Sequence, residues 1–261
     1  MEREERLSRL VDYIVANGSA HVEQIVETFE VSPATARRDL DALADQQLVT
    51  RTRGGAMVNS ISGDLPMRYR TVRQPGEKSA IGAKAVSLVT PGEVIAFNGG
   101  TTTTVAAYEV GVATAGDERF AGSVTTVVTN AVNIANDLIV RQNLRIVVTG
   151  GVARSQSYEL VGPLASLMLP EINIDTLFLG VSAFDLEHGL FTHHEGEAAV
   201  NAALVSLARR TFVLADSDKF SATAFARICA IEDVEGVVTD SGADPAVLDE
   251  LRRRGLEVHV G

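Results

Sequence analysis

The 261-residue chain is long enough for one large domain and one small one, and its 46% apolar and 22% charged residues are typical of a globular protein. It shows neither a secretory leader nor an apolar run that could cross a bilayer, and Cys229 is its one cysteine. We therefore expect a cytoplasmic protein with no membrane partner. The formal net charge of -11 excludes a generally basic nucleic-acid-binding surface, so any such surface must be a local cluster of basic side chains.

Apolar residues recur at helical spacing three times near the start of the chain. The first pattern runs from Arg6 to about Asn17, where Asn17-Gly18 supplies a stop, and the second runs from Val22 to Phe29. A third begins at Ser32-Pro33, where serine is a good N-cap and proline suits the first helical turn. These patterns predict three short helices.

The stretch Leu48–Ala56 alternates and then turns at two glycines, which predicts a β-hairpin. Three helices followed by a hairpin wing indicate a winged helix-turn-helix domain over residues 1–57. Residues 58–75 contain glycine, proline and polar residues without a clean period, so they are expected to form a linker.

In a helix-turn-helix the second helix of the motif enters the major groove of double-stranded DNA. Here that helix turns Ala36, Leu40 and Leu43 toward the core and leaves its opening residues outside. Arginine can pair bidentately with guanine or hold phosphates. From periodicity alone, an ordinary amphipathic helix with two exposed arginines fits equally well, although the wing arginines favour DNA. The expected DNA contacts are Ser32, Pro33, Thr35, Arg37, Arg38, Arg51 and Arg53.

Beyond Pro75 the chain alternates short β-branched runs with helical patterns, which predicts a mostly parallel sheet covered by helices over residues 76–261. A last run, Leu256–Val260, is expected at an edge, and Cys229 is expected to be a small core residue. The other expected strands are Val94–Phe97, Val124–Thr129, Arg145–Thr149, Thr176–Val181, Thr211–Ala215 and Gly236–Thr239.

Two glycine turns follow expected strands. The turn Asn98–Thr102 leads into a helix beginning near Thr103, so its backbone amides and the helix dipole favour an anion such as phosphate. Gly150-Gly151 ends a strand expected beside the first, which would leave room for a sugar. Alternatively, the first turn is a tight connection with an N-cap threonine, and the second is a plain turn.

Three polar side chains are candidates to surround such a ligand. The carboxylates of Asp185 and Glu197 could accept hydroxyl protons, and the ammonium of Lys219 could meet the phosphate. Each has a structural alternative: Asp185 as a turn cap, Glu197 as a solvated helix charge, and Lys219 as the partner of a neighbouring aspartate.

His193, His194 and Glu195 invite a metal hypothesis, because imidazole and carboxylate groups are common zinc ligands. No third ligand stands at a convincing spacing, so we expect a solvated loop, although the histidines could touch the ligand. No metal site and no cofactor are expected.

The segments Val31–Leu40 and Arg51–Ala56 resemble the N-terminal signature of the DeoR family of bacterial repressors, and the resemblance covers nearly the whole chain. It continues through Glu77-Lys78, the two glycine turns, Val128–Asn130, Glu197-Ala198 and Asp216–Phe220. The resemblance implies a transcription repressor whose sensor domain is similar in fold to ribose-5-phosphate isomerase and the CoA-transferases and binds a phosphorylated sugar. The ligand contacts that it supports are Asn98, Gly99, Gly100, Thr101, Thr102, Thr103, Gly150, Gly151, Asp185, Glu197 and Lys219.

The chain departs from the family pattern at several of these positions. Asn98 stands where aspartate is common, Gly99 where serine is frequent, and Asn201 where lysine often follows Glu197. Ser182–Phe184 is also bulkier than the glycine-rich version. An asparagine lacks the negative charge of aspartate and adds a donor, so the identity of the effector does not follow from the resemblance.

Two other functions compete with this interpretation. One is a sugar-phosphate isomerase with an accessory DNA-binding head, although Asn98 cannot act as a general base. The other is a winged helix that docks on a protein. For a regulator we expect a homo-oligomer, a dimer or tetramer, because paired heads match the two-fold symmetry of operators.

Overall fold

The computed structural model describes residues 3–46, 48–58, 67 and 74–261, which divide into two compact units, Met1–Val72 and Arg73–Gly261. Most of the linker expected over residues 58–75 lies outside the described residues. Each unit is therefore considered by itself.

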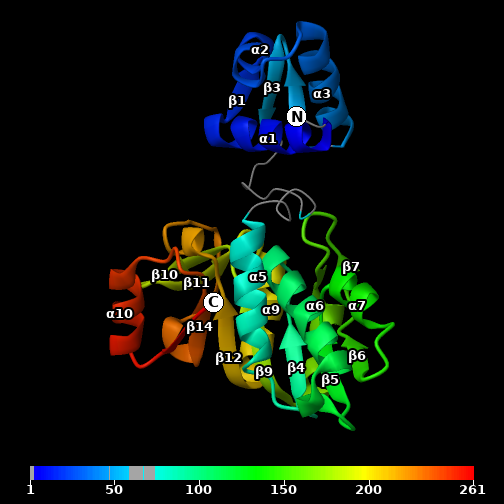
Figure 1. The fold of residues 1–261 in the computed structure, drawn as a ribbon, viewed down its shortest axis with the longest axis vertical. Helices are drawn as coiled ribbons and strands as arrows, with labels where there is room; N and C mark the ends of the chain where they lie inside the picture. The colour runs from blue at the N-terminus through cyan, green and yellow to red at the C-terminus, as the bar shows by residue number, and fades with distance from the viewer. Residues whose placement is uncertain (1–2, 47, 59–66, 68–73) are drawn as a thin grey trace. The chain divides into compact units, whose positions relative to one another are not determined.

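The N-terminal unit packs three helices against a small antiparallel sheet of order β1-β3-β2 (Figure 1). Leu10, Ile14, Ile25, Leu40 and Leu43 fill its core with essentially no exposed surface. The three helices and the hairpin predicted from the sequence are confirmed. The elements are α1 (Arg3–Asn17), β1 (Ser19–His21), α2 (Val22–Phe29), α3 (Pro33–Asp45), β2 (Val49–Thr52) and β3 (Gly55–Val58).

Strand β1 was not expected from the sequence, because its three residues are too few to show a period. It pairs with β3 so closely that a Cβ at Gly55 would lie 2.2 Å from the Ala20 carbonyl oxygen. The glycine in the hairpin therefore permits the third strand, and the third strand fixes the wing to the helices.

The C-terminal unit is built on a seven-stranded parallel sheet of order β15-β14-β12-β9-β4-β5-β6. The predicted parallel α/β fold is confirmed, and β15 lies at an edge as expected. One expectation is wrong: β6, which ends before Gly150, lies beside β5 and not beside β4. The strands are β4 (Val94–Phe97), β5 (Thr125–Thr129), β6 (Leu144–Val148), β9 (Ile174–Gly180), β12 (Ala208–Leu214), β14 (Gly236–Thr239) and β15 (Glu257–Val260).

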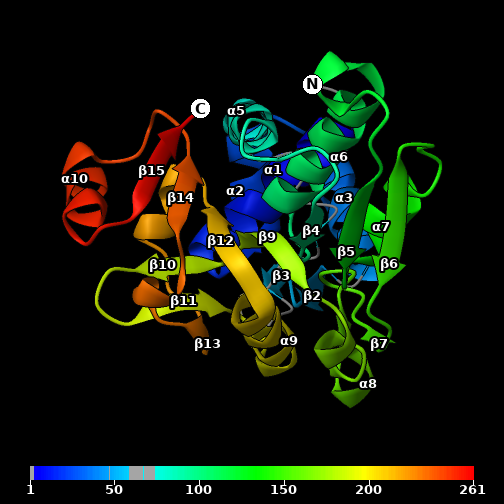
Figure 2. The ribbon, with the colours of Figure 1, turned by 90° about the horizontal axis from the view of Figure 1, so that it is seen from below.

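Alternating residues of each buried strand face opposite sides of this sheet, as the two-residue period of a strand requires. In β9, Phe178 packs in the core cluster of α5, α6 and α7, whereas Leu177 and Leu179 pack in the cluster of α9 and α10. Figure 2 shows α5 and α6 on one side of the sheet and α9 on the other. The helices are α5 (Pro75–Val86), α6 (Thr101–Gly116), α7 (Val132–Leu138), α8 (Pro163–Ser166), α9 (Glu195–Leu207) and α10 (Pro245–Arg253).

Two small antiparallel sheets were not predicted. Strands β10 (Ala183–Asp185), β11 (Gly189–Thr192) and β13 (Ala226–Cys229) form one, and β7 (Val152–Ala153) and β8 (Leu160–Val161) form the other. Their short strands lie within segments that alternate poorly. These segments carry two of the polar residues considered below, Asp185 in β10 and Arg154 directly after β7.

The strand order reverses between β4 and β9. From β4 the chain proceeds to β5 and β6 on one side, and it then crosses to β9, β12, β14 and β15 on the other. In open α/β sheets, ligands bind in the crevice outside the carboxyl ends of the strands at such a switch point. The loops after Phe97 and Gly180 therefore frame the candidate site.

Phe178 should be a main contributor to the stability of the C-terminal unit. Its ring is fully buried between Phe97 and Phe212, at centroid distances of 5.1 and 6.4 Å. Phe178→Ala should lower the free energy of unfolding by about 3–5 kcal/mol in a calorimetric measurement. Phe225→Ala, at a ring that is 80% exposed, is the matched control and should change it by about 0.5 kcal/mol or less. Equal losses in the two variants would contradict this packing.

Candidate DNA-binding and ligand-binding sites

Helix α3 begins with the cap that the sequence predicts. The Ser32 Oγ accepts a hydrogen bond from the Thr35 backbone N–H at 3.1 Å and lies 2.9 Å from the Thr35 Oγ1, and Pro33 occupies the first turn. The two hydroxyls therefore fix the start of the helix. Their predicted contact with DNA remains a prediction.

Helix α3 is joined to α1 by an ion pair that sequence reasoning missed. The Arg6 guanidinium donates from Nε and Nη2 to the two Asp39 carboxylate oxygens, at 2.7 and 3.3 Å, and Asp39 is 2% exposed. The side-chain hydrogen bond to Asp39 raises the pKa of Arg6. This bidentate pair sets the orientation of α3 against its neighbour.

The predicted DNA-facing arginines differ in their surroundings. Arg37, Arg38 and Arg53 are exposed and make no hydrogen bond or ion pair with the described residues. Arg51 instead forms an ion pair with Asp41 at 2.9 Å and donates to the Gly55 carbonyl at 2.6 Å. Arg51 thus stabilises the wing, whereas the other three guanidinium groups remain available to a polyanion.

In the C-terminal unit, Asn98 joins the two halves of the sheet at the switch point. Its Nδ2 donates to the Gly180 carbonyl at 2.9 Å, and its Oδ1 accepts from the Gly180 N–H at 2.7 Å. The Asn98 side-chain amide N–H, which an aspartate would lack, therefore bonds to the protein backbone at Gly180. Asn98 positions the crevice, and its direct contact with a ligand remains a prediction.

The predicted glycine turn follows and opens α6. Gly100 has a φ of +138°, and its carbonyl accepts from the hydroxyls of Thr103 and Thr104 at 3.0 and 2.7 Å. Thr101 is half-buried and Thr102 is buried. The first backbone N–H groups of α6 have no partners within the helix, so this turn can bind an anion.

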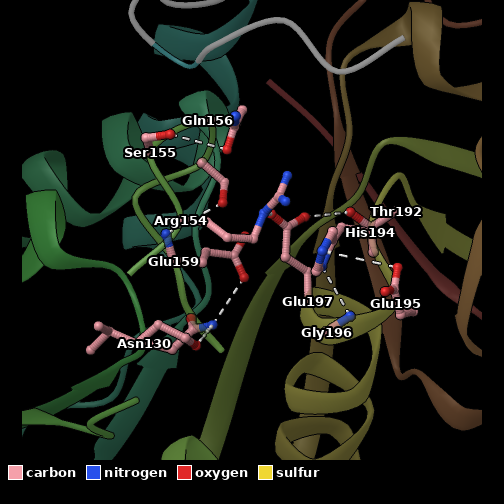
Figure 3. Close-up of polar contacts among 12 residues, drawn as sticks. Asn130, Arg154, Ser155, Gln156, Glu159, Thr192, His194, Glu195, Gly196 and Glu197 are labelled. Carbon is pink, nitrogen blue, oxygen red and sulfur yellow. Dashed lines mark hydrogen bonds and ion pairs between the residues drawn. The ribbon is translucent and has the colours of Figure 1, made fainter. Parts of the chain in front are cut away.

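Glu159, which the sequence analysis missed, reaches this turn from the segment before β8. Its carboxylate accepts from the Asn130 Nδ2 at 2.9 Å, and the residue is 4% exposed. A Cβ at Gly99 would lie 2.3 Å from the Glu159 Cγ, so the two residues are in close contact. Figure 3 shows the Glu159 side chain directed toward Asn130.

Glu197 is buried in the first turn of α9 and is not a solvated helix charge. It accepts from the Arg154 Nε at 2.9 Å and from the Thr192 hydroxyl at 3.0 Å (Figure 3). Arg154 was not a predicted site residue, because it lies in a short polar segment without periodicity. This pair joins the loop after β7 to α9.

Several charged side chains lie around the turn after β12. Burial raises the pKa of Asp216, while the nearby ammonium groups of Lys219 and Lys78 act in the opposite direction. Lys78 is buried in the first turns of α5. The structure thus places the predicted Lys219 in a charged cluster, and the resemblance motif Glu77-Lys78 was the signal that could have identified Lys78.

The remaining predicted residues lie elsewhere. Asp185 caps the β10–β11 turn: its Oδ1 accepts from the Glu187 and His188 N–H groups at 2.8 Å each, and these bonds lower its pKa. Gly151, after Gly150, lies against β8, where a Cβ would meet the Val161 carbonyl oxygen at 2.8 Å. Asp185 therefore matches its structural alternative, and the second glycine turn is packed against protein.

The loop before α9 does not assemble a metal site from the described residues, among which no three His, Cys, Asp or Glu side chains gather suitably. His194 caps α9, its Nδ1 accepting from the Gly196 N–H at 3.0 Å. Cys229 is half-buried, and burial raises the pKa of its thiol to about 12. Its thiolate is consequently scarce at neutral pH.

The comparison with known families decides the identity of the chain. The DeoR C-terminal sensor domain matches residues 73–241, and the DeoR-like helix-turn-helix domain matches residues 6–62. The chain belongs to the DeoR family of transcriptional regulators. The resemblance identified in the sequence is thus confirmed.

Relatives in this family match over their full lengths. The chain is 31% identical to the putative aga operon transcriptional repressor of Escherichia coli O157:H7, covering 97% of this chain and 92% of that protein. It is 28% identical to the glycerol-3-phosphate regulon repressor of Escherichia coli K12, covering all of both chains. Ribose 5-phosphate isomerase A of Methanocaldococcus jannaschii aligns at 19% identity with a TM-score of 0.41, covering 55% of this chain and 53% of that one.

This DeoR-family chain is a DNA-binding transcriptional regulator, an interpretation that its relatives favour over the isomerase alternative. None of its described helices is both long and apolar enough to cross a membrane.

Arg37→Ala and Arg38→Ala should each weaken DNA binding by about 1–3 kcal/mol, because exposed arginines at the start of α3 are positioned for base or phosphate contacts. Fluorescence anisotropy on a duplex selected from random sequence by the full chain measures the loss. Arg252→Ala, an exposed arginine of α10, is the control for net charge. Unchanged affinity in both α3 variants would show that α3 is not the reading helix.

Asn98→Asp should lower the free energy of unfolding by about 1–3 kcal/mol at neutral pH, because a carboxylate cannot donate to the Gly180 carbonyl. Lowering the pH should recover part of the loss, since a protonated carboxyl can donate. Chemical unfolding of the full chain at several pH values measures the effect. Asn173→Asp, at an exposed residue before β9, is the control. A variant as stable as the parent chain at neutral pH would contradict the role of this amide.

Proposed function

We propose that this DeoR-family regulator is a repressor of genes of sugar metabolism, and that a phosphorylated sugar bound at the β4–β9 switch point controls it. The glycine turn at the start of α6 is the observation that carries the proposal. It presents unpaired backbone amides at the carboxyl edge of the sheet, beside Asn98, which stabilises the crevice. One relative is named for a regulon of a phosphorylated metabolite, glycerol 3-phosphate, which supports a phosphorylated effector.

Buried acceptor atoms favour a polyhydroxylated ligand. The Oδ1 atoms of Asn130, Asn201 and Asp216 are buried and have no hydrogen-bond partner among the described residues. Asn130 follows β5, Asp216 follows β12, and Asn201 lies one helical turn beyond the buried Glu197. A buried acceptor without a donor costs about 1–3 kcal/mol, and sugar hydroxyls are donors that could recover this.

The coupling to DNA is proposed to pass through the turn Asp216–Phe220 and the start of α5. The Gln74 Nε2, at the N-cap of α5, donates to the Asp218 Oδ2 at 2.8 Å. Lys219, the predicted phosphate contact, is the next residue. Because the linker to the DNA-binding unit ends at α5, a ligand that displaces Lys219 would also displace the point at which the linker ends.

The functional unit is proposed to be a homo-oligomer, because two copies of the winged helix match the two-fold symmetry of an operator. The effector changes DNA affinity only to the extent that it binds the DNA-competent and DNA-incompetent arrangements differently.

The effector class is testable with ribose 5-phosphate, glucose 6-phosphate and glycerol 3-phosphate, each beside its unphosphorylated parent. At 100 times its Kd, a true ligand should stabilise the full chain by about 2.7 kcal/mol in a thermal-shift assay. It should also change the affinity of the chain for DNA, measured by fluorescence anisotropy. Lys219→Met should lower the affinity for the sugar phosphate at least about tenfold. Lys84→Met, in the last turn of α5, should leave that affinity unchanged. If no sugar phosphate produces a shift, or if one is turned over at enzymatic rates, the proposal is wrong.

A further inference from the structure

The carboxylate of Glu159 lies where an anionic ligand would approach the glycine turn. The Glu159 Oε1 would be 2.7 Å from a Cβ at Gly99, the residue before the N-cap of α6. A negative charge at the N-terminus of a 16-residue helix is stabilised by the helix dipole, as a phosphate would be. The protein thus supplies its own anion at this turn.

The backbone on both sides of Glu159 is held by hydrogen bonds, so a ligand that displaces the carboxylate acts on the side chain and not on the path of the loop. The Leu160 N–H donates to the Asn130 carbonyl at 2.6 Å, and the Val132 N–H donates to the Tyr158 carbonyl at 3.0 Å. Tyr158 has a φ of +61°, an uncommon conformation for a non-glycine residue. The hydrogen bonds on either side of Glu159 fix this conformation.

Asn130 supplies an independent indication that the place is built for a ligand. Its Nδ2 donates to Glu159, but its Oδ1, in a fully buried residue, has no partner among the described residues. A ligand with a hydroxyl next to its anionic group could donate to this oxygen and receive the hydrogen bond that Glu159 now accepts.

We propose that Glu159 is a specificity-determining residue, an internal anion that an effector must displace from the glycine turn. This inference rests on the proposed function and deepens it. Because the incoming group replaces a carboxylate, a neutral sugar gains nothing at the turn, and a singly charged sugar acid only exchanges one charge for another. A phosphate dianion brings more charge than it displaces and binds with a net gain, so the cost of displacing Glu159 leaves phosphorylated sugars, and not sugar acids, with a measurable affinity.

The test compares Glu159→Gln with the unmodified chain. Glutamine keeps an oxygen that accepts from Asn130 but removes the charge that opposes an incoming anion. Isothermal titration with inorganic phosphate, and with the sugar phosphates and sugar acids, should show affinities raised about tenfold or more in the variant. The affinity for the unphosphorylated parent sugars should not change.

Glu195→Gln is the matched control, because Glu195 also lies at a helix N-terminus, that of α9, but its side chain is 76% exposed, and solvent screens its charge. It should leave every affinity within about twofold. Far-ultraviolet circular dichroism and the thermal unfolding temperature check that both variants are folded.

The outcomes separate the two proposals. If the unmodified chain binds sugar phosphates and Glu159→Gln binds them equally or more weakly, Glu159 is not a displaced anion, and the proposed function stands. If neither chain binds any phosphorylated sugar, the proposed function itself is wrong. Tighter binding of anions and neutral sugars alike would also overturn the inference, because it would indicate a loosened pocket and not a removed charge.

Discussion

The pair of hydrogen bonds between Asn98 and Gly180 is the constraint on which the sensor site depends. A parallel sheet whose strand order reverses leaves a gap between the helices that follow the two central strands. Without a tie at their carboxyl ends, the loops after β4 and β9 could separate. The Asn98 amide donates to and accepts from the same residue on β9, so it fixes both the distance and the relative orientation of the loops. The glycine turn and α6 follow Asn98 directly in the chain, so this pair of hydrogen bonds also fixes where they begin.

Much of the fold could be predicted because hydrophobic patterns report burial. Fully buried parallel strands such as Gly236–Thr239 appear as short apolar runs, and the N-terminal helices show one apolar face. The order of the strands does not follow from such runs, which is why β6 was wrongly expected beside β4. The small sheets were missed because their short strands, unlike Gly236–Thr239, contain no run of β-branched residues.

Candidate site residues could be predicted where their place between a strand and a helix indicates their use. They could not be predicted where their partner is distant in the sequence. The turn at Gly99-Gly100 could be singled out because its glycines lie between a predicted strand and a predicted helix, where backbone amides are exposed to an anion. Arg154 and Glu159 were missed because an arginine and a glutamate in a polar loop resemble a solvated surface. Only the fold shows that one is paired with the buried Glu197 and the other with Asn130. Asp185 shows that a polar residue can also have a local structural use, because its carboxylate caps a hairpin turn, and its contact with a ligand stays a prediction.

In the proposed mechanism, the turn after β12 carries the effect of the site to the start of α5. Its start is anchored to the sheet, because the Ser217 N–H donates to the Asp240 carboxylate at 2.7 Å after β14. Its next residues face two ways: Asp218 accepts from Gln74 at the start of α5, and Lys219 lies near the buried Asp216. A short 3₁₀ helix has little slack, so Lys219 cannot move far without moving Asp218. In this proposal the sheet is the fixed frame, and α5 is the element whose first turn responds to occupancy of the site, because Gln74 is bonded to Asp218.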